Sequence, residues 1–112
     1  MVQYSPVLDS TFSALSDPTR RGILQTLGRR DASITDLAER FAMTLTGIKK
    51  HVRVLEEAGL VRSQKVGRVR TCRLGPRRLE REAAWIEDYR RTLEERLDSL
   101  DDFLQRTKGK TP

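Results

Sequence analysis

Hydrophobic and polar positions follow two different periods along this chain. Up to Ala58, apolar residues recur every three to four positions, as on one face of an amphipathic helix. Over residues 60–74, apolar and β-branched residues alternate with polar ones, which is typical of short strands. From about Ala83 the helical period returns. The pattern predicts a mainly α-helical chain with one small β-hairpin, that is, an α+β fold.

Local capping signals set the expected element boundaries. The helices expected in the first half cover about residues 8–15, 18–27, 36–41 and 45–58. We place Asp17, Thr35 and Thr44 as N-caps, because Asp and Thr side chains accept hydrogen bonds from the unpaired N–H groups of a first helical turn. Gly28 and Gly59 follow two of these helices as stop signals.

The expected hairpin joins residues 60–65 to residues 69–74, and Gly67 supplies the left-handed conformation that a tight turn needs. Two helices joined by a tight turn and followed by such a hairpin form a winged helix-turn-helix. We expect one domain over residues 1–112, because a chain of this length has room for a single core. Its helix-turn-helix, wing hairpin and C-terminal helical dimerisation region are expected at residues 35–58, 60–74 and 76–106.

The C-terminal region carries a heptad-like seam of apolar residues. The seam consists of Ile86, Tyr89, Leu93, Leu97, Leu100 and Leu104. Only 37% of the 112 residues are hydrophobic, and one copy offers little core in which to bury the seam. We therefore expect a homodimer in which the long helix forms the interface, joined across the two-fold axis by Leu8 and Phe12.

Basic charge is concentrated in the middle of the chain. The net charge is +6, but residues 19–78 carry fifteen Lys and Arg against five Asp and Glu, a net of +10. The segments before and after are mildly acidic, at −2 each. A concentrated basic face favours a polyanionic partner, and double-stranded DNA is the partner that suits a helix-turn-helix.

Side chains suited to DNA fall on the solvent face of the fourth helix. Ile48, Val52 and Leu55 form its expected buried stripe. A rotation of about 100° per residue then places donors and cations on the opposite face, where they can meet base edges and phosphates. Arg68 and Arg70 at the hairpin tip are expected to enter a minor groove or to hold phosphates. The expected DNA-binding residues are Thr44, Thr46, Gly47, Lys49, Lys50, His51, Arg53, Lys65, Arg68 and Arg70.

Several short motifs together resemble the ArsR/SmtB repressors, a family of winged helix-turn-helix transcription regulators. The motifs are Ser-Asp-Pro-Thr-Arg-Arg at residues 16–21, Asp-Leu-Ala at residues 36–38 and His-Val-Arg-Val-Leu-Glu-Glu-Ala-Gly-Leu-Val at residues 51–61. The resemblance covers about residues 10–75 and implies a homodimer that binds an imperfect palindrome near its own promoter and usually represses. It also implies that residues 44–53 form the recognition helix and residues 66–70 the wing.

The sequence departs from the metal-sensing members of that family. Some of these carry Cys-x-Cys where this chain has Ser33 and Thr35, and others use His residues of the last helix, which has none here. The single Cys72 and the single His51 lie too far apart in sequence to assemble a metal site within one protomer. We therefore expect a member of the non-metal-sensing branch, with no metal and no other cofactor. Whether a small molecule acts as inducer is left open.

The sequence thus predicts a DNA-binding transcriptional regulator with no enzymatic activity, since no nucleophile or paired carboxylates surround His51. No apolar run is long enough for a membrane span and no signal-peptide pattern is present, so we expect a cytoplasmic protein without a membrane partner. Two other roles stay open, a DNA-binding activator or architectural factor and a protein-interaction module. Cys72 is expected to be a small strand residue, with a redox switch promoted by Arg70 and Arg73 as the alternative.

Overall fold

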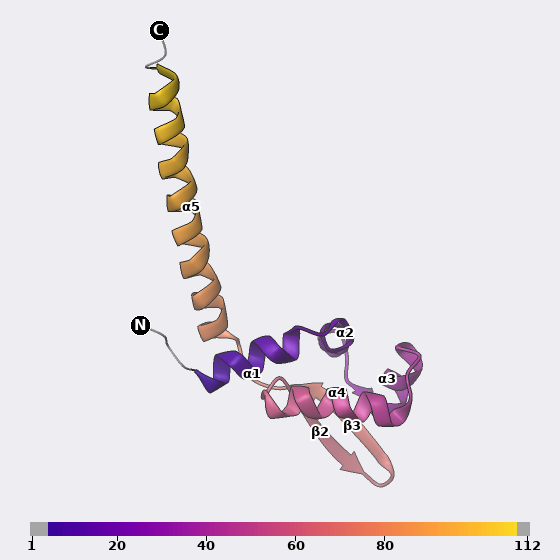
Figure 1. The fold of residues 1–112 in the computed structure, drawn as a ribbon. Coiled ribbons are helices and arrows are strands. Elements are labelled where there is room, and N and C mark those ends of the chain that lie inside the picture. Colours follow the sequence, from indigo (N-terminus) through magenta and orange to yellow (C-terminus); the bar gives the residue numbers. More distant parts are fainter. Residues whose placement is uncertain (1–4, 110–112) are drawn as a thin grey trace. The chain divides into compact units, whose positions relative to one another are not determined.

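The computed structural model describes residues 5–109 and divides the chain into two compact units, one ending at Arg78 and the other beginning at Leu79. The first unit contains α1 (Pro6–Leu15), α2 (Pro18–Leu27), β1 (Ala32–Ser33), α3 (Ile34–Arg40), α4 (Leu45–Glu57), β2 (Val61–Val66) and β3 (Val69–Leu74) (Figure 1). The second unit is one helix, α5 (Glu80–Gly109). The predicted fold class, a winged helix-turn-helix with a long C-terminal helix, is confirmed.

Two of the three predicted N-caps are confirmed. The Asp17 carboxylate accepts a hydrogen bond of 3.0 Å from the backbone N–H of Arg20. α2 begins at Pro18, and proline suits this position because an N–H of the first turn would have no partner within the helix. Thr44 Oγ1 accepts a bond of 3.1 Å from the N–H of Gly47 at the start of α4. Both caps depend on residues within three positions of each other, which is why the sequence predicts them.

The predicted cap of α3 is wrong, because Ser33 and not Thr35 holds that position. Ser33 Oγ accepts a bond of 3.0 Å from the N–H of Asp36, and the Asp36 carboxylate accepts one of 3.3 Å from the N–H of Ser33. This capping box satisfies two N–H groups at once, so the helix begins at Ile34, ahead of the predicted start. Thr35 lies exposed in the first turn.

The predicted hairpin is confirmed, and the sheet has one strand more than expected. β2 and β3 pair antiparallel around the two-residue turn of Gly67 and Arg68, and Gly67 has the expected positive φ, +63°. The strand order is β1-β3-β2, with Ala32 of β1 opposite Cys72 of β3. β1 is only two residues long, too short to show an alternating pattern.

An aliphatic core holds the first unit together. Ile23 of α2, Leu37 of α3 and both Ile48 and Leu55 of α4 are fully buried, and Val52 is 2% exposed. The predicted buried stripe of α4 is therefore confirmed. Because this stripe anchors one side of α4, the opposite side is fixed as a solvent-facing surface.

Two arginines connect separate elements of the first unit. Arg20 Nε donates a hydrogen bond of 2.8 Å to the carbonyl oxygen of Ala14 at the end of α1. Arg77, which follows β3, donates one of 2.7 Å to the buried Thr11 Oγ1 and one of 2.9 Å to the carbonyl oxygen of Ala58. Arg77 thus links α1 to the C-terminal end of α4 and helps to fix the frame that carries the helix-turn-helix.

α5 is 30 residues long and has an exposed apolar face. Between 44% and 57% of each seam side chain is exposed, at Ile86, Tyr89, Leu93, Leu97, Leu100 and Leu104. Trp85 stacks on Tyr89 with ring centroids 5.7 Å apart, and Arg90 forms ion pairs with Glu87 and Glu94. Within residues 5–109, none of the helices has the length and apolar character needed to cross a membrane.

Candidate nucleic-acid interface

One face of α4 is exposed and basic. Besides Glu57 at its C-terminal end, the exposed polar residues of α4 are Thr46, Lys49, Lys50 and Arg53. They lie opposite the buried stripe of the helix, so the hydrophobic core fixes which way they face. These side chains are the groove-facing set that the sequence predicts, and the structure places all of them on the solvent side.

Thr44 and Gly47 both serve the start of α4 itself. The Thr44 hydroxyl already accepts the N–H of Gly47. A Cβ added at Gly47 would lie 3.0 Å from Met43 Cε and 3.3 Å from Thr44 Oγ1, closer than ordinary van der Waals contact. The absent side chain therefore preserves the cap. The expected contacts of Thr44 and Gly47 with DNA are a separate role, and they stay a prediction.

His51 lies apart from the exposed cations of α4. Its Nδ1 atom is 3.3 Å from an Arg20 guanidinium nitrogen and 3.9 Å from Asp17 Oδ2, and 20% of the side chain is exposed. The hydrogen bond from the Arg20 N–H outweighs partial desolvation and, with the neighbouring His51 and Arg20 side chains, lowers the pKa of the Asp17 carboxyl. His51 thus connects α4 to the start of α2, and its predicted contact with DNA is untested.

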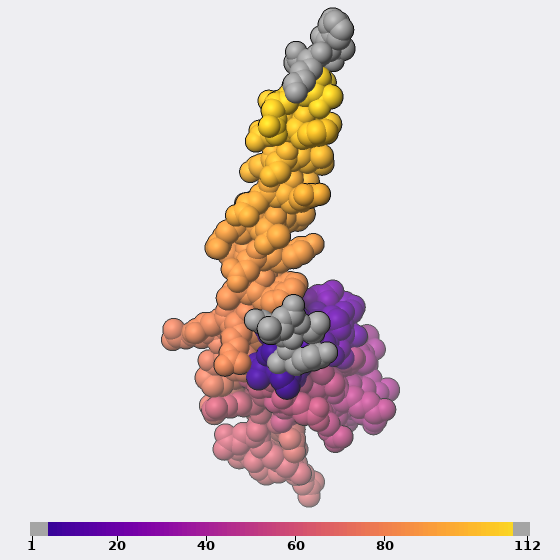
Figure 2. All heavy atoms as spheres, turned by 60° about the vertical axis from the view of Figure 1, so that its left-hand side comes forward, coloured from indigo at the N-terminus to yellow at the C-terminus, as the bar shows by residue number. Residues whose placement is uncertain are grey.

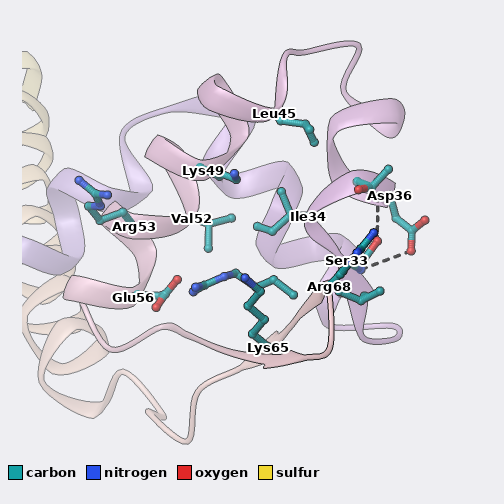
Figure 3. A pocket seen from close by; sticks show the side chains of 13 residues that line it. Ser33, Ile34, Asp36, Leu45, Lys49, Val52, Arg53, Glu56, Lys65 and Arg68 are labelled. Carbon is teal, nitrogen blue, oxygen red and sulfur yellow. Dashed lines mark hydrogen bonds between the residues drawn. The ribbon is translucent and has the colours of Figure 1, made fainter.

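The wing, α4 and the start of α3 line a basic hollow of about 660 Å³. Five predicted DNA-binding residues line it, namely Lys49, Arg53, Lys65, Arg68 and Arg70. Figure 3 shows Lys49 reaching it from α4, Lys65 from β2 and Arg68 from the hairpin turn. The hairpin itself stands out from the body of the first unit (Figures 1 and 2). Cations from separate elements therefore meet on one surface, which can hold a phosphate backbone.

Two carboxylates outside the predicted set of DNA-binding residues also line the hollow, those of Asp36 and Glu56. Glu56 Oε1 accepts a hydrogen bond of 3.1 Å from Ser63 Oγ, which in turn accepts one of 3.1 Å from an Arg70 guanidinium nitrogen. Glu56 follows Lys49 by seven positions, so both lie on one side of α4. That spacing is the sequence signal that could have pointed to Glu56.

Cys72 is fully buried on β3, opposite Ser63 of β2. Desolvation, together with the negative charge of Glu56, raises the pKa of its thiol to about 11, although Arg70 acts in the other direction. The alternative of a redox switch required neighbouring arginines to lower this pKa, and burial outweighs them. At neutral pH the thiol is protonated and shielded, which favours the expected role as a small strand residue.

Within the described part of the chain, His, Cys, Asp and Glu side chains do not gather in groups of three or more that could hold a metal ion. Ser33, at one position where metal sensors carry cysteine, caps α3. Thr35, at the other, is exposed. Independence from metals stays a prediction for binding experiments.

The remaining predicted residues are those of the dimer interface. Leu8 and Phe12 are partly exposed on α1. The six seam residues of α5 are exposed, as described above. Each unit therefore presents apolar side chains at predicted interface positions, and the pairing of two copies stays a prediction.

Comparison with known proteins relates this geometry to a family. A family model described as a helix-turn-helix domain matches residues 15–64. The transcriptional repressor SdpR of Bacillus subtilis (strain 168) is 29% identical over 82 residues, which cover 73% of this chain and 91% of SdpR. The HTH-type transcriptional regulator YuzN of the same strain is 41% identical over 69 residues, covering 55% of this chain and 75% of YuzN.

A solved structure supports the same relationship. The crystal structure of an ArsR family transcriptional regulator is 39% identical to this chain, with a TM-score of 0.74, and the match covers 84% of this chain and 97% of that protein. Sequence identity, coverage and fold thus agree over nearly the whole length of that protein. The chain belongs to the ArsR family of helix-turn-helix transcriptional regulators.

Proposed function

We propose that this regulator is a homodimeric repressor that binds an imperfect DNA palindrome near its own promoter. α4 enters the major groove, and the β2–β3 hairpin acts as a wing on the neighbouring backbone or minor groove. The observation that carries the proposal is the basic hollow, where α4 and the hairpin direct five cations to one surface. The printed name of the relative SdpR, a transcriptional repressor, favours repression over activation.

Electrostatics favour a nucleic acid over a protein partner. The segment over residues 19–78, which holds α4 and the wing, has a net charge of +10, whereas the segments on both sides are acidic. Contacts to phosphates supply most of the sequence-independent affinity for DNA, and contacts to base edges supply the specificity. In this proposal Thr46, Lys49 and Lys50 contact base edges, while Arg68 and Arg70 contact phosphates or a minor groove.

A second copy of the chain supplies the symmetry that a palindrome requires. The exposed apolar face of α5 provides the pairing surface, together with Leu8 and Phe12 of α1. A two-fold dimer presents two recognition helices about 34 Å apart, so that they meet successive major grooves. A single copy cannot reach both half-sites. Because its proposed partner is chromosomal DNA, we place the protein in the cytoplasm.

The proposal assigns the protein to the branch of the family that does not sense metals. A transition-metal site needs several convergent thiolate, imidazole or carboxylate ligands. The chain has one Cys and one His, and these are used elsewhere, Cys72 in the buried sheet and His51 beside Asp17. Added zinc, copper or arsenite should therefore leave the protein on its DNA.

The salt dependence of binding tests the proposal against its main alternative, a protein-interaction module. Fluorescence anisotropy of the full chain on a labelled duplex should show log affinity falling steeply and linearly with log salt concentration, because each phosphate contact releases counterions. An unlabelled duplex that carries the operator palindrome should compete far better than a scrambled duplex of equal composition. Weak binding without salt dependence would contradict the proposal and favour the protein-interaction module.

A further inference from the structure

Leu45 is an exposed apolar residue at the start of α4, beside exposed polar and basic residues such as Thr46 and Lys49. It is the first residue of the helix, and 48% of it is exposed. The apolar residues that anchor α4 in the core, such as Ile48 and Leu55, are completely buried. Leu45 thus lies outside the core stripe, one turn before Lys49 on the same side of the helix.

The side chain of Leu45 faces the proposed DNA surface. It lines the basic hollow with Lys49 and Arg68, and Figure 3 shows it at the N-terminal end of α4. The cap and the core anchor of this end of α4 are made by other residues, Thr44 and Ile48. The N-terminal residues of a recognition helix contact base edges in the major groove.

We infer that Leu45 is a specificity residue that recognises thymine through its C5-methyl group. The inference rests on the proposed function, since it requires α4 in the major groove. Among the four bases, only thymine presents an apolar group on its major-groove edge, and apolar side chains recognise it by contact. Lys49 cannot make that contact, but its ammonium can donate to acceptors of an adjacent base. The pair Leu45 and Lys49 therefore recognises a thymine together with a neighbouring acceptor-bearing base.

The test removes one methyl group at a time from the DNA. The full chain first selects a duplex from a random library, and that duplex is resynthesised with deoxyuridine replacing thymidine at single positions. Affinities are measured for the wild type, for Leu45→Ala and for Leu45→Met, which keeps an apolar contact. Leu74→Ala is the matched control, because Leu74 is similarly exposed, at 44%, but lies at the end of β3 outside the hollow.

We expect at least one thymidine whose replacement weakens wild-type binding about fourfold, the effect of losing one buried methyl group. Leu45→Ala should bind the thymidine and deoxyuridine duplexes equally at that position, whereas Leu45→Met and Leu74→Ala should still discriminate. If Leu45→Ala discriminates as the wild type does, or if no position is sensitive, the inference is wrong while DNA binding stands. If the wild type selects no duplex at all, the proposed function itself fails.

Discussion

Glu56 of α4 accepts a hydrogen bond of 3.1 Å from the hydroxyl of Ser63 on β2. The same hydroxyl accepts one of 3.1 Å from Arg70 on β3. α4 and both strands of the β2–β3 hairpin are thereby joined through a single serine. The proposed function needs this connection, because DNA must meet α4 and the wing at the same time.

Replacing Ser63 by alanine should therefore loosen the wing. The variant loses two hydrogen bonds, each with a net contribution of about 1 kcal/mol to stability. We expect a lower free energy of unfolding in urea and weaker binding to the selected duplex. Ser99→Ala, at an exposed serine of α5, is the control and should change neither property by a comparable amount. Normal DNA affinity in Ser63→Ala would show that the connection does not position the wing.

Substitutions in the wing and in α4 should have different effects on DNA binding. The double variant Arg68→Ala/Arg70→Ala should weaken binding to all duplexes and lower the salt slope by about 2, one for each lost phosphate contact. Arg90→Ala/Arg91→Ala removes the same charge from α5 and is the matched control. If both double variants have the same slope, the wing does not contact phosphates.

Lys50→Ala should instead alter specificity. Lys50 is exposed on the groove-facing side of α4, and a lysine there can donate to a guanine edge. Its loss should change the differences in binding free energy between operator variants by about 1–3 kcal/mol. Competition with duplexes that carry single-base substitutions measures this change. An equal loss of affinity for every sequence would make Lys50 a phosphate contact.

The parts of the fold that the sequence predicts are those determined by nearby residues. Asp17, Thr44 and Gly67 each act on a turn within three positions, so their residue types suffice to place α2, α4 and the hairpin. The hydrogen bond from Arg77 to Thr11 spans 66 positions and has no local signature. In α3 the local signals compete, and the capping box at Ser33 prevails over a single cap at Thr35.

The candidate site likewise has residues that the sequence predicts and contacts that it does not. Helical periodicity is enough to place Lys49 and Arg53 on the exposed face of α4. The bond between Glu56 and Ser63 depends on how β2 returns along α4, which periodicity alone does not determine. His51 shows the limit of the pattern, since periodicity places it on α4 among the expected DNA-binding residues, whereas its contact with Arg20 depends on how α2 and α4 pack together.

Cys72 should make the stability of the protein depend on alkaline pH. Its pKa is about 11 in the folded protein, above the ordinary value of 9.0, so the folded state favours the protonated thiol. This contribution to stability is complete below about pH 9 and is lost as the pH rises toward 11. The free energy of unfolding should therefore fall more between pH 9 and 11 in the wild type than in Cys72→Ala. Equal pH dependence in the two proteins would contradict the assigned pKa.

Charges in the seam of α5 should prevent dimerisation. Leu93→Glu/Leu97→Glu places two carboxylates on the proposed interface, and each unpaired buried charge costs several kcal/mol. Analytical ultracentrifugation should find a monomer that binds a full palindrome no better than a half-site. Asp98→Ala/Asp101→Ala, which alters charges beside the seam, should remain a dimer. A normal dimer with normal operator affinity in the seam variant would place the interface elsewhere.

The most direct test of sequence-specific operator binding is a footprint of the purified protein on the DNA upstream of its own gene. The proposed function predicts two protected half-sites in inverted orientation, with centres about one helical turn, or a multiple of it, apart. Protection should survive an excess of unrelated competitor DNA. Protection that is absent, or that spreads evenly over this DNA and a scrambled control, would contradict the proposal that this chain is an operator-binding repressor.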